Sequence, residues 1–526
     1  MNRILIGGYC SRGSLVKHTT LLCRTSSTAT ADYVDGVSGS GDIKPFSDIP
    51  GPKGLYDIPF IGTALHFKPF TKYKPNDLLD VLSVMRDKHG DIVKVRMGKY
   101  HVVFVYHPDY AKAVFQLPFK EHTRVGLDLN DIFHERTGIP KDLGTLQGEK
   151  WAALRKPTQE KMLRPAVVTS YVPLIEQVTS DFIDMLRTKK TVDDLLTELM
   201  NYTTESVGML CFNTRLGCFE SNTSAEISKH VKEFFSIFQS SVTMPFKTYK
   251  HFRTKLYKRF EHASLEILRI TGGYLSAQRN RLMNLEKEGK LEEYLEKEPN
   301  FMYSLLTDPR MTESKVKGIV SSLFLAGIDS TANSMVFVLT NLALNPDKQD
   351  KLYKEIQRVV GDSKSLTKDH LNELSYLKCC IKESQRLVFP VMIGAPRLLE
   401  TDIVLGGYRI PNKTLVHPNM SAMSRDERFY PRPNEYIPER WLRNTTDDIS
   451  KGQDFPFGMK PFGFGPRGCI GQRFAEMEMY IAIAKIIQNF AVVMPESVTE
   501  VKSMSKTFTT PAETVIMHFK ERNKQS

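Results

Sequence analysis

The sequence lacks the cysteine patterns of a secreted or zinc-binding protein. Its 7 cysteines are an odd number, scattered over 526 residues, and no two form a CxxC pair. This argues against a disulfide framework and a CxxC zinc site, and it favours a reducing compartment. No RNA- or DNA-binding signature is present either. The net charge of +12 therefore favours anionic lipid or an acidic protein as a partner over nucleic acid.

The first 31 residues contain no acidic residue and no apolar run longer than three residues, far too short to span a bilayer. They are rich in Ser and Thr and carry Arg3, Arg12, Lys17 and Arg24. This composition is typical of a mitochondrial transit peptide. We predict such a segment over residues 1–31, with cleavage between about residues 25 and 45. The alternative is a tail without a targeting role.

From the sequence after residue 31 we predict a flexible linker over residues 32–48 and one folded domain over residues 49–526. Hydrophobic residues make up 41% and charged residues 25%, which is ordinary for a globular protein able to enclose a cofactor. Most of the domain shows helical periodicity, so we predict a mainly α fold with a small β-rich region. A hairpin is expected over 91–106 and a closing hairpin over Phe508 to Phe519.

The most informative stretch runs from Phe462 to Gly471. Three glycines lie within four residues of Cys469, and Arg467 stands two residues before it. Such a loop can direct backbone N–H groups at one sulfur and stabilise its thiolate, and the helix predicted from Gln472 adds its positive end. A cysteine beside glycine is more commonly a small buried side chain in a turn. The complete pattern F-x-x-G-x-R-x-C-x-G, however, resembles the haem-thiolate loop of the cytochrome P-450 family.

This resemblance implies that Cys469 is the proximal ligand of a haem b iron. Trp151 and Arg155 lie four residues apart on one helical face and match the family's WxxxR pair, whose members reach a haem propionate. Arg397 corresponds to a second propionate arginine. Within the loop itself, Phe462 and Arg467 are the further cofactor-binding residues that the resemblance implies.

A long apolar helix is predicted from Met311 to Asn345, and its middle holds a glycine, an acid and two hydroxyl residues, which do not suit an apolar helix. These are Gly327, Asp329, Ser330 and Thr331. Hydroxyl groups can bond back to helix carbonyls and open a groove. The segment is similar to the family's A-G-x-D-T pattern, in which the groove holds dioxygen and water and the acid feeds protons. Ser330 stands where threonine is usual, so we hypothesise looser coupling of oxygen use to product formation.

Two further motifs are similar to the family's structural triad. Glu383 and Arg386 form an ExxR pair, and Arg440 lies in the downstream sequence Pro438-Glu439-Arg440-Trp441. An ExxR pair alone is common on helix surfaces and contributes little. In the family, the three residues lock the scaffold beneath the haem loop and take no part in catalysis.

Electron delivery is predicted from a cluster of basic residues. Lys378 and Lys382 share one face of the ExxR helix, and Arg473 opens the helix after the loop. Mitochondrial members of the family use such a lysine pair to bind an acidic [2Fe–2S] ferredoxin, and paired cations steer acidic partners. Gln472 departs from that group, where arginine is frequent. The alternative is that both lysines are simply solvated.

The segment from Phe234 to Arg259 combines aromatic and basic residues. An amphipathic helix pair packed on the core is the favoured interpretation, and a lid resting on an anionic membrane is the alternative.

Together the motifs predict a mitochondrial-type monooxygenase that hydroxylates an apolar molecule, sterol-like or xenobiotic, with O2. Electrons would come from a ferredoxin supplied by an NADPH-dependent ferredoxin reductase. The expected location is the matrix side of the inner mitochondrial membrane, bound peripherally. The rival functions are a microsomal enzyme, a peroxide-driven or isomerising haem-thiolate enzyme, and a non-enzymatic haem sensor or carrier.

Overall fold

The structure of this chain is a computed structural model that describes residues 42–74, 77–118, 123–220, 223–244, 247–363, 365–391, 396–443 and 448–522. The predicted transit segment lies outside the described residues. The described part of the predicted linker runs beside strand β6 (Tyr408–Ile410). The amide of Lys44 donates to the carbonyl of Gly407, and the amide of Arg409 donates to the carbonyl of Lys44, both at 2.9 Å.

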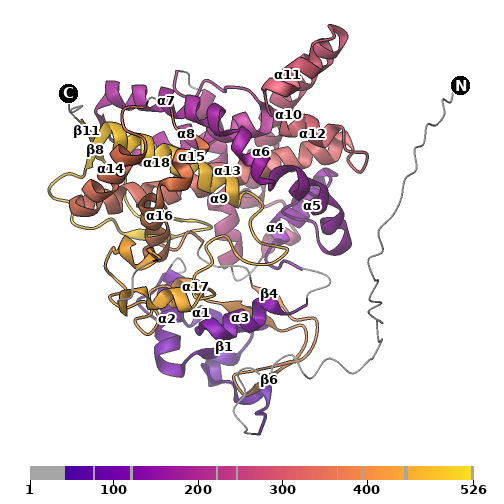
Figure 1. Cartoon of the computed structure of the whole chain (residues 1–526). Helices are drawn as coiled ribbons and strands as arrows, with labels where there is room; N and C mark the ends of the chain where they lie inside the picture. Colours follow the sequence, from indigo (N-terminus) through magenta and orange to yellow (C-terminus); the bar gives the residue numbers. More distant parts are fainter. Residues whose placement is uncertain are drawn as a thin grey trace, which may run out of the picture.

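Helices dominate the described chain, which confirms the predicted fold class. The α-helices are α1 (Ile61–Ala64), α2 (Leu78–His89), α3 (Pro108–Gln116), α4 (Asp128–Thr137), α5 (Gly148–Met162), α6 (Pro165–Ser170), α7 (Val172–Lys189), α8 (Leu195–Phe212), α9 (Thr223–Thr243), α10 (Lys255–Lys287), α11 (Leu291–Lys297), α12 (Phe301–Leu306), α13 (Glu313–Leu344), α14 (Pro346–Val359), α15 (Lys368–Glu373), α16 (Ser375–Leu387), α17 (Met420–Met423) and α18 (Gln472–Asn489). Most of them gather in one half of the molecule, while α1, α2, α3 and the largest sheet form the other half (Figure 1).

Strands are few and short. Besides β6 they are β1 (Ile92–Met97), β2 (Tyr100–Val105), β3 (Thr191–Val192), β4 (Arg397–Leu398), β5 (Ile403–Leu405), β7 (Leu415–Pro418), β8 (Phe490–Val493), β9 (Ser503–Ser505), β10 (Thr509–Pro511) and β11 (Met517–Glu521). The largest sheet has the order β1-β2-β7-β4, with β2 and β7 parallel. In it, β4 pairs with β7 so that Arg397 lies opposite Val416, which fixes the position of this arginine.

The predicted hairpin over 91–106 is confirmed by the antiparallel pairing of β1 and β2. The predicted closing hairpin from Phe508 to Phe519 is wrong. Both of its halves contain strands, but β10 pairs with β9, whereas β11 pairs with β8 and β3. Alternation of side chains identifies a strand without identifying its partner, and here the partners come from other parts of the chain.

Helix α13 organises the helical half. It begins where the side chain of Thr312 accepts a hydrogen bond from the amide of Lys315, and Pro346 opens the next helix directly after its end. It packs against α8, α10, α16 and α18. Among the described helices it alone is long and apolar enough to cross a bilayer, but 67% of its most apolar window is buried, as expected for a core helix.

Candidate active site

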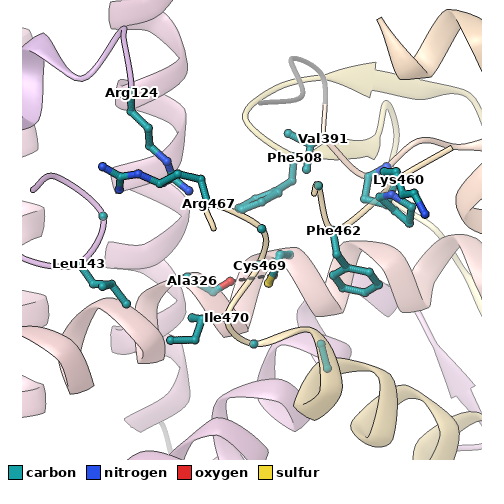
Figure 2. A pocket seen from close by; sticks show the side chains of 18 of the residues that line it. Arg124, Leu143, Ala326, Val391, Lys460, Phe462, Arg467, Cys469, Ile470 and Phe508 are labelled. Carbon is teal, nitrogen blue, oxygen red and sulfur yellow. Dashed lines mark hydrogen bonds between the residues drawn. The ribbon is translucent and has the colours of Figure 1, made fainter. Parts of the chain in front are cut away.

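The loop from Phe462 to Gly471 is held in a compact shape by its own backbone. The amide of Cys469 donates to the carbonyl of Phe462 at 2.8 Å. Gly463 and Gly465 adopt φ values of 73° and 76°, which other residues rarely do, so the glycines permit this turn. Phe462 itself lines the adjoining cavity together with Cys469 (Figure 2).

The surroundings of the sulfur act on its pKa in two directions, and the net effect raises the pKa above its usual value. Burial raises the pKa of the Cys469 thiol, while the backbone N–H of Gly471 and the charges of Arg155 and Arg124 lower it. Helix α18 starts at Gln472, so its positive end also lies next to the sulfur. Burial is the largest of these effects and favours the neutral thiol, so a bound cation is needed to stabilise the thiolate, which is the metal-binding form of cysteine.

A cavity of about 830 Å³ adjoins the loop. Cys469 forms part of one wall, and the middle of α13 contributes Ala326, Gly327, Ser330 and Thr331. Figure 2 shows Cys469, Phe462 and Ile470 around this space, with Ala326 contributed by α13. Most of the lining is apolar, so a hydrophobic molecule of substantial size fits the cavity.

Positive charge is concentrated on the polar part of this lining. Four arginines face the cavity, and burial lowers their pKa values: to about 10 for Arg155 and Arg397, to about 9 for Arg467, and downward for Arg124. The one acidic residue among the described lining residues is Glu478, whose pKa burial raises to about 8. A carboxyl group with that pKa is mostly neutral near pH 7, so the charge of the described lining residues is predominantly positive.

These residues fit a haem. Its two propionates would complement the positive charge of the arginines, its flat apolar ring would suit the remaining lining, and a cysteine thiolate is a suitable iron ligand.

The predicted arginines also brace the cysteine loop. The guanidinium of Arg467 lies 3.9 Å from the ring centre of Trp151. Arg155 donates from Nη2 to the carbonyl of Gly468 at 2.9 Å, and Arg397 donates from Nη2 to the carbonyl of Phe464 at 2.8 Å. The structure therefore brings Trp151 and the arginines of three different segments together at one loop.

Neighbouring residues on α13 face different surroundings. The Ser330 hydroxyl donates to the carbonyl of Ala326 at 2.7 Å, and both Ser330 and Thr331 line the cavity. Asp329 is not among the lining residues; its Oδ1 accepts a hydrogen bond from Asn333 Nδ2 at 3.1 Å. The structure thus brings the two hydroxyl residues to the cavity and leaves the carboxylate behind them.

Gly327 has a packing reason of its own. A side-chain carbon at this position would lie 2.7 Å from Cγ2 of Val207 on α8. Glycine therefore allows α8 and α13 to approach closely beside the cavity, which both Gly327 and Val207 line.

The structure brings Glu383, Arg386 and Arg440 together in the interior, each no more than 1% exposed. Arg386 donates to both carboxylate oxygens of Glu383, at 2.8 and 2.9 Å, and Arg440 Nε donates to Oε1 at 2.9 Å. Trp441 Nε1 adds a bond of 2.8 Å to Oε2, a partner that sequence reasoning missed. Both arginines also bond to several carbonyl groups of the segment 424–449, which ties that segment to α16.

The predicted docking residues differ in exposure. Lys382 is exposed, and its ammonium lies 3.8 Å from the ring centre of Trp441. Lys378 is half-buried and donates to the carbonyl of Asn372 at 2.9 Å. Arg473 is exposed at the start of α18 and bonds to the carbonyl of Leu163.

Sequence reasoning missed Arg124 and Glu478. Arg124 points into the cavity beside Arg467 (Figure 2), but no spacing or motif links it to the other arginines. Its amide donates to Gln147 Oε1 at 2.8 Å, a contact that sequence cannot show. Glu478 offered a weak signal, because it is an acid inside the apolar pattern of the helix that follows the loop.

Comparison with known proteins identifies the family. The sequence profile of the family named cytochrome P-450 matches residues 52–519. This chain belongs to the cytochrome P-450 family. It is therefore a haem-thiolate monooxygenase, and thiolate-ligated haem b is the family's cofactor.

Individual relatives support the mitochondrial type. The chain is 30% identical over 475 residues to "Probable cytochrome P-450 12a5, mitochondrial" of Drosophila melanogaster, covering 85% of this chain and 86% of the relative. It is 30% identical to "Cytochrome P-450 10" of Lymnaea stagnalis, covering 92% and 87%. It is 26% identical to the mitochondrial 1,25-dihydroxyvitamin D(3) 24-hydroxylase of Mus musculus, covering 87% and 86%. These similarities confirm the prediction of a mitochondrial cytochrome P-450.

Proposed function

We propose that this P-450 hydroxylates an apolar small molecule, sterol-like or xenobiotic, with Cys469 as the iron ligand. The observation that carries the proposal is a large apolar cavity walled by one cysteine, four arginines and the hydroxyl-bearing part of α13. When bound, the haem supplies the activation of dioxygen, in which one oxygen atom enters a C–H bond and the other leaves as water.

The chain's own residues would position and supply this chemistry. Arg155, Arg397 and Arg467 hold the propionates by charge-assisted hydrogen bonds, with Trp151 packed beside them. The hydroxyl of Ser330 orients a proton donor at the cavity wall. Because Asp329 lies behind that wall, its protons reach the cavity through an intervening hydroxyl or water, and Thr331 provides a second hydroxyl on the same wall.

Ligand binding and product analysis test this assignment. Apolar candidates are screened by the shift of the haem Soret band, and products of the ferredoxin-supported reaction are identified by mass spectrometry. Cys469→Ser should abolish the long-wavelength band that thiolate ligation gives to the reduced carbon monoxide complex. An unchanged band would overturn the assignment of Cys469, and turnover without NADPH would support a peroxide-driven enzyme instead.

We further propose that Lys378, Lys382 and Arg473 dock an acidic [2Fe–2S] ferredoxin reduced by an NADPH-dependent ferredoxin reductase. The support is the exposure of Lys382 and Arg473 together with the mitochondrial names of the relatives. Lys382→Glu should raise the KM for ferredoxin several-fold at low salt and leave ligand-induced Soret shifts unchanged. The matched control is Lys287→Glu, an exposed lysine at the far end of α10. Loss of Soret shifts together with coupling would count against docking.

The proposed location is the matrix side of the inner mitochondrial membrane, after removal of residues 1–31. The support is the arginine-containing, acid-free N-terminus and the exposed apolar residues of the first described segment. N-terminal sequencing of the protein isolated from mitochondria tests it, and a retained N-terminus would contradict it.

A further inference from the structure

Helices α9 and α10 pack antiparallel, and their facing residues can be read from their contacts. Glu233 of α9 pairs with Arg259 of α10 at 2.9 Å, and the rings of Phe234 and Phe260 lie 4.9 Å apart. Residues nearer the start of α9 contact residues nearer the end of α10. These contacts show which residues of the two helices lie opposite each other.

Further along the helix pair, each helix carries one glutamate and one histidine, and both types of side chain can bind metal ions. Glu226 and His230 lie four residues apart on α9, and His262 and Glu266 lie four residues apart on α10, so each pair shares a helix face. The ring centres of His230 and His262 lie 5.6 Å apart, with the edge of one ring towards the face of the other. One ring nitrogen of His230 and one oxygen from each carboxylate lie within 4.8 Å of one another.

His230 supplies an independent indication of a ligand. The residue is only 6% exposed, and its Nδ1 has no hydrogen-bond partner among the described residues. A buried polar atom without a partner is unfavourable, and a metal ion bound through this nitrogen would satisfy it.

The two carboxylates already attract a cation. Arg269 donates from Nη2 to Glu226 at 2.9 Å and from Nε to Glu266 at 2.8 Å. Its side chain is 60% exposed, so it can move into solvent without leaving a buried charge behind. The ion pairs of Arg269 with the two carboxylates can therefore be broken without burying an unpaired charge.

We propose that Glu226, His230 and Glu266 bind a divalent transition-metal ion, of which Zn²⁺ is the best match, and that the ion displaces Arg269. A mixture of imidazole and carboxylate ligands suits Zn²⁺, whereas Mg²⁺ and Ca²⁺ prefer oxygen ligands alone. Zinc bonds of about 2.0–2.2 Å require the ligand atoms to draw together slightly. His262, whose ring lies beside that of His230, is the candidate fourth ligand.

Such an ion would tie α9 to α10. Since α9 also contributes Phe238 and Gln239 to the haem cavity, the ion would restrain one wall of that cavity. The proposal is separate from the assignment of substrate or electron donor and stands or falls independently of them.

Zinc titration of the untagged, haem-loaded protein tests the site, with isothermal calorimetry for affinity and elemental analysis for stoichiometry. One zinc per chain is expected. Glu226→Gln and His230→Gln should each weaken zinc binding by at least about tenfold. Even the loss of a residue that only supports a metal ligand typically lowers metal affinity by about 10- to 100-fold. Arg269→Gln removes the competing cation and should tighten binding.

The matched control is Glu233→Gln, which breaks a similar ion pair between α9 and α10 and should leave zinc affinity unchanged. X-ray absorption at the zinc edge should show nitrogen and oxygen ligands, and the carbon monoxide spectrum confirms that each variant is folded. Unchanged affinity in His230→Gln, equal weakening in Glu233→Gln, or no zinc retained after dialysis would each overturn the site.

Discussion

At the scale of single residues, Asp329 and Ser330 are adjacent on α13 but face different surroundings. The Ser330 hydroxyl lies at the cavity wall, and the Asp329 carboxylate lies behind it with Asn333. A proton held by Asp329 therefore needs a second group to reach the cavity. We propose that the hydroxyl of Ser330 serves that step, because it lies on the cavity wall at the next position in the helix.

Removing that hydroxyl should uncouple oxygen use from product formation. We expect Ser330→Ala to lower the ratio of product to NADPH consumed by about two- to tenfold, the factor that corresponds to a hydrogen bond of about 0.5–1.5 kcal/mol. Ser330→Thr, which keeps the hydroxyl and stiffens its rotamer, should improve the ratio. The control is Ser276→Ala, an exposed serine that makes the same kind of bond to a helix carbonyl, at 2.8 Å. Equal ratios in Ser330→Ala and the natural protein would refute the role.

Asp329 should also make stability depend on pH. Burial raises its pKa from 3.8 to about 6, against the opposing charges of Lys232 and Lys506. The folded state therefore holds this proton more tightly than the unfolded state. Its stabilising contribution is complete below pH 3.8 and is lost as the pH rises through about 6.

The variant Asp329→Asn cannot ionise and keeps an oxygen that accepts from Asn333. Its melting temperature, relative to the natural protein, should rise as the pH increases from about 5 to about 8, while its turnover falls. Thermal unfolding across this range measures the effect. A difference that stays constant with pH would show that the carboxyl is ionised equally in both states.

At the scale of elements, the buried triad links α16 to the segment before the cysteine loop. Glu383→Gln leaves Arg386 and Arg440 buried without a full counter-charge, so we expect a loss of about 3–5 kcal/mol in unfolding free energy and a lower haem content. The matched control is Glu435→Gln, which breaks an exposed i, i+3 pair with Arg432 and should change stability little. Denaturant unfolding compares the two. Similar small losses in both would mean that the triad is not a structural lock.

The same elements show what sequence can predict. The loop around Cys469, the helix from 313 to 344 and the ExxR pair were predictable because each motif is local and lies within one element. Arg124 was not, because its position depends on packing across the cavity. The partners of β10 and β11 were not either, since strand pairing here joins segments distant in sequence. The site's motifs could be found from local pattern, but which side of α13 faces the cavity could not.

At the scale of the whole molecule, the exposed apolar side chains of the described N-terminal segment need an explanation. Four large apolar side chains in a stretch of sixteen residues are between 39% and 66% exposed: Leu55, Phe60, Ile61 and Phe70. They belong to the half of the molecule that holds α1 and the largest sheet, away from the projecting end of α10 and α11 (Figure 1). Several exposed large apolar residues in one short segment favour a role in contacting a membrane or a partner.

We predict that this segment contacts an anionic membrane. The double variant Leu55→Ser/Ile61→Ser should reduce binding of the purified protein to vesicles of anionic and neutral lipid by about tenfold or more, because each large apolar side chain that enters the interface contributes roughly 1.5–3 kcal/mol. Met283→Ser is the matched control, an apolar residue that is 44% exposed near the end of α10. Vesicle flotation measures both variants. Because the chain carries a net charge of +12, added salt should weaken binding of the natural protein as well. If the double variant floats with vesicles as fully as the control, the membrane contact must lie on another face.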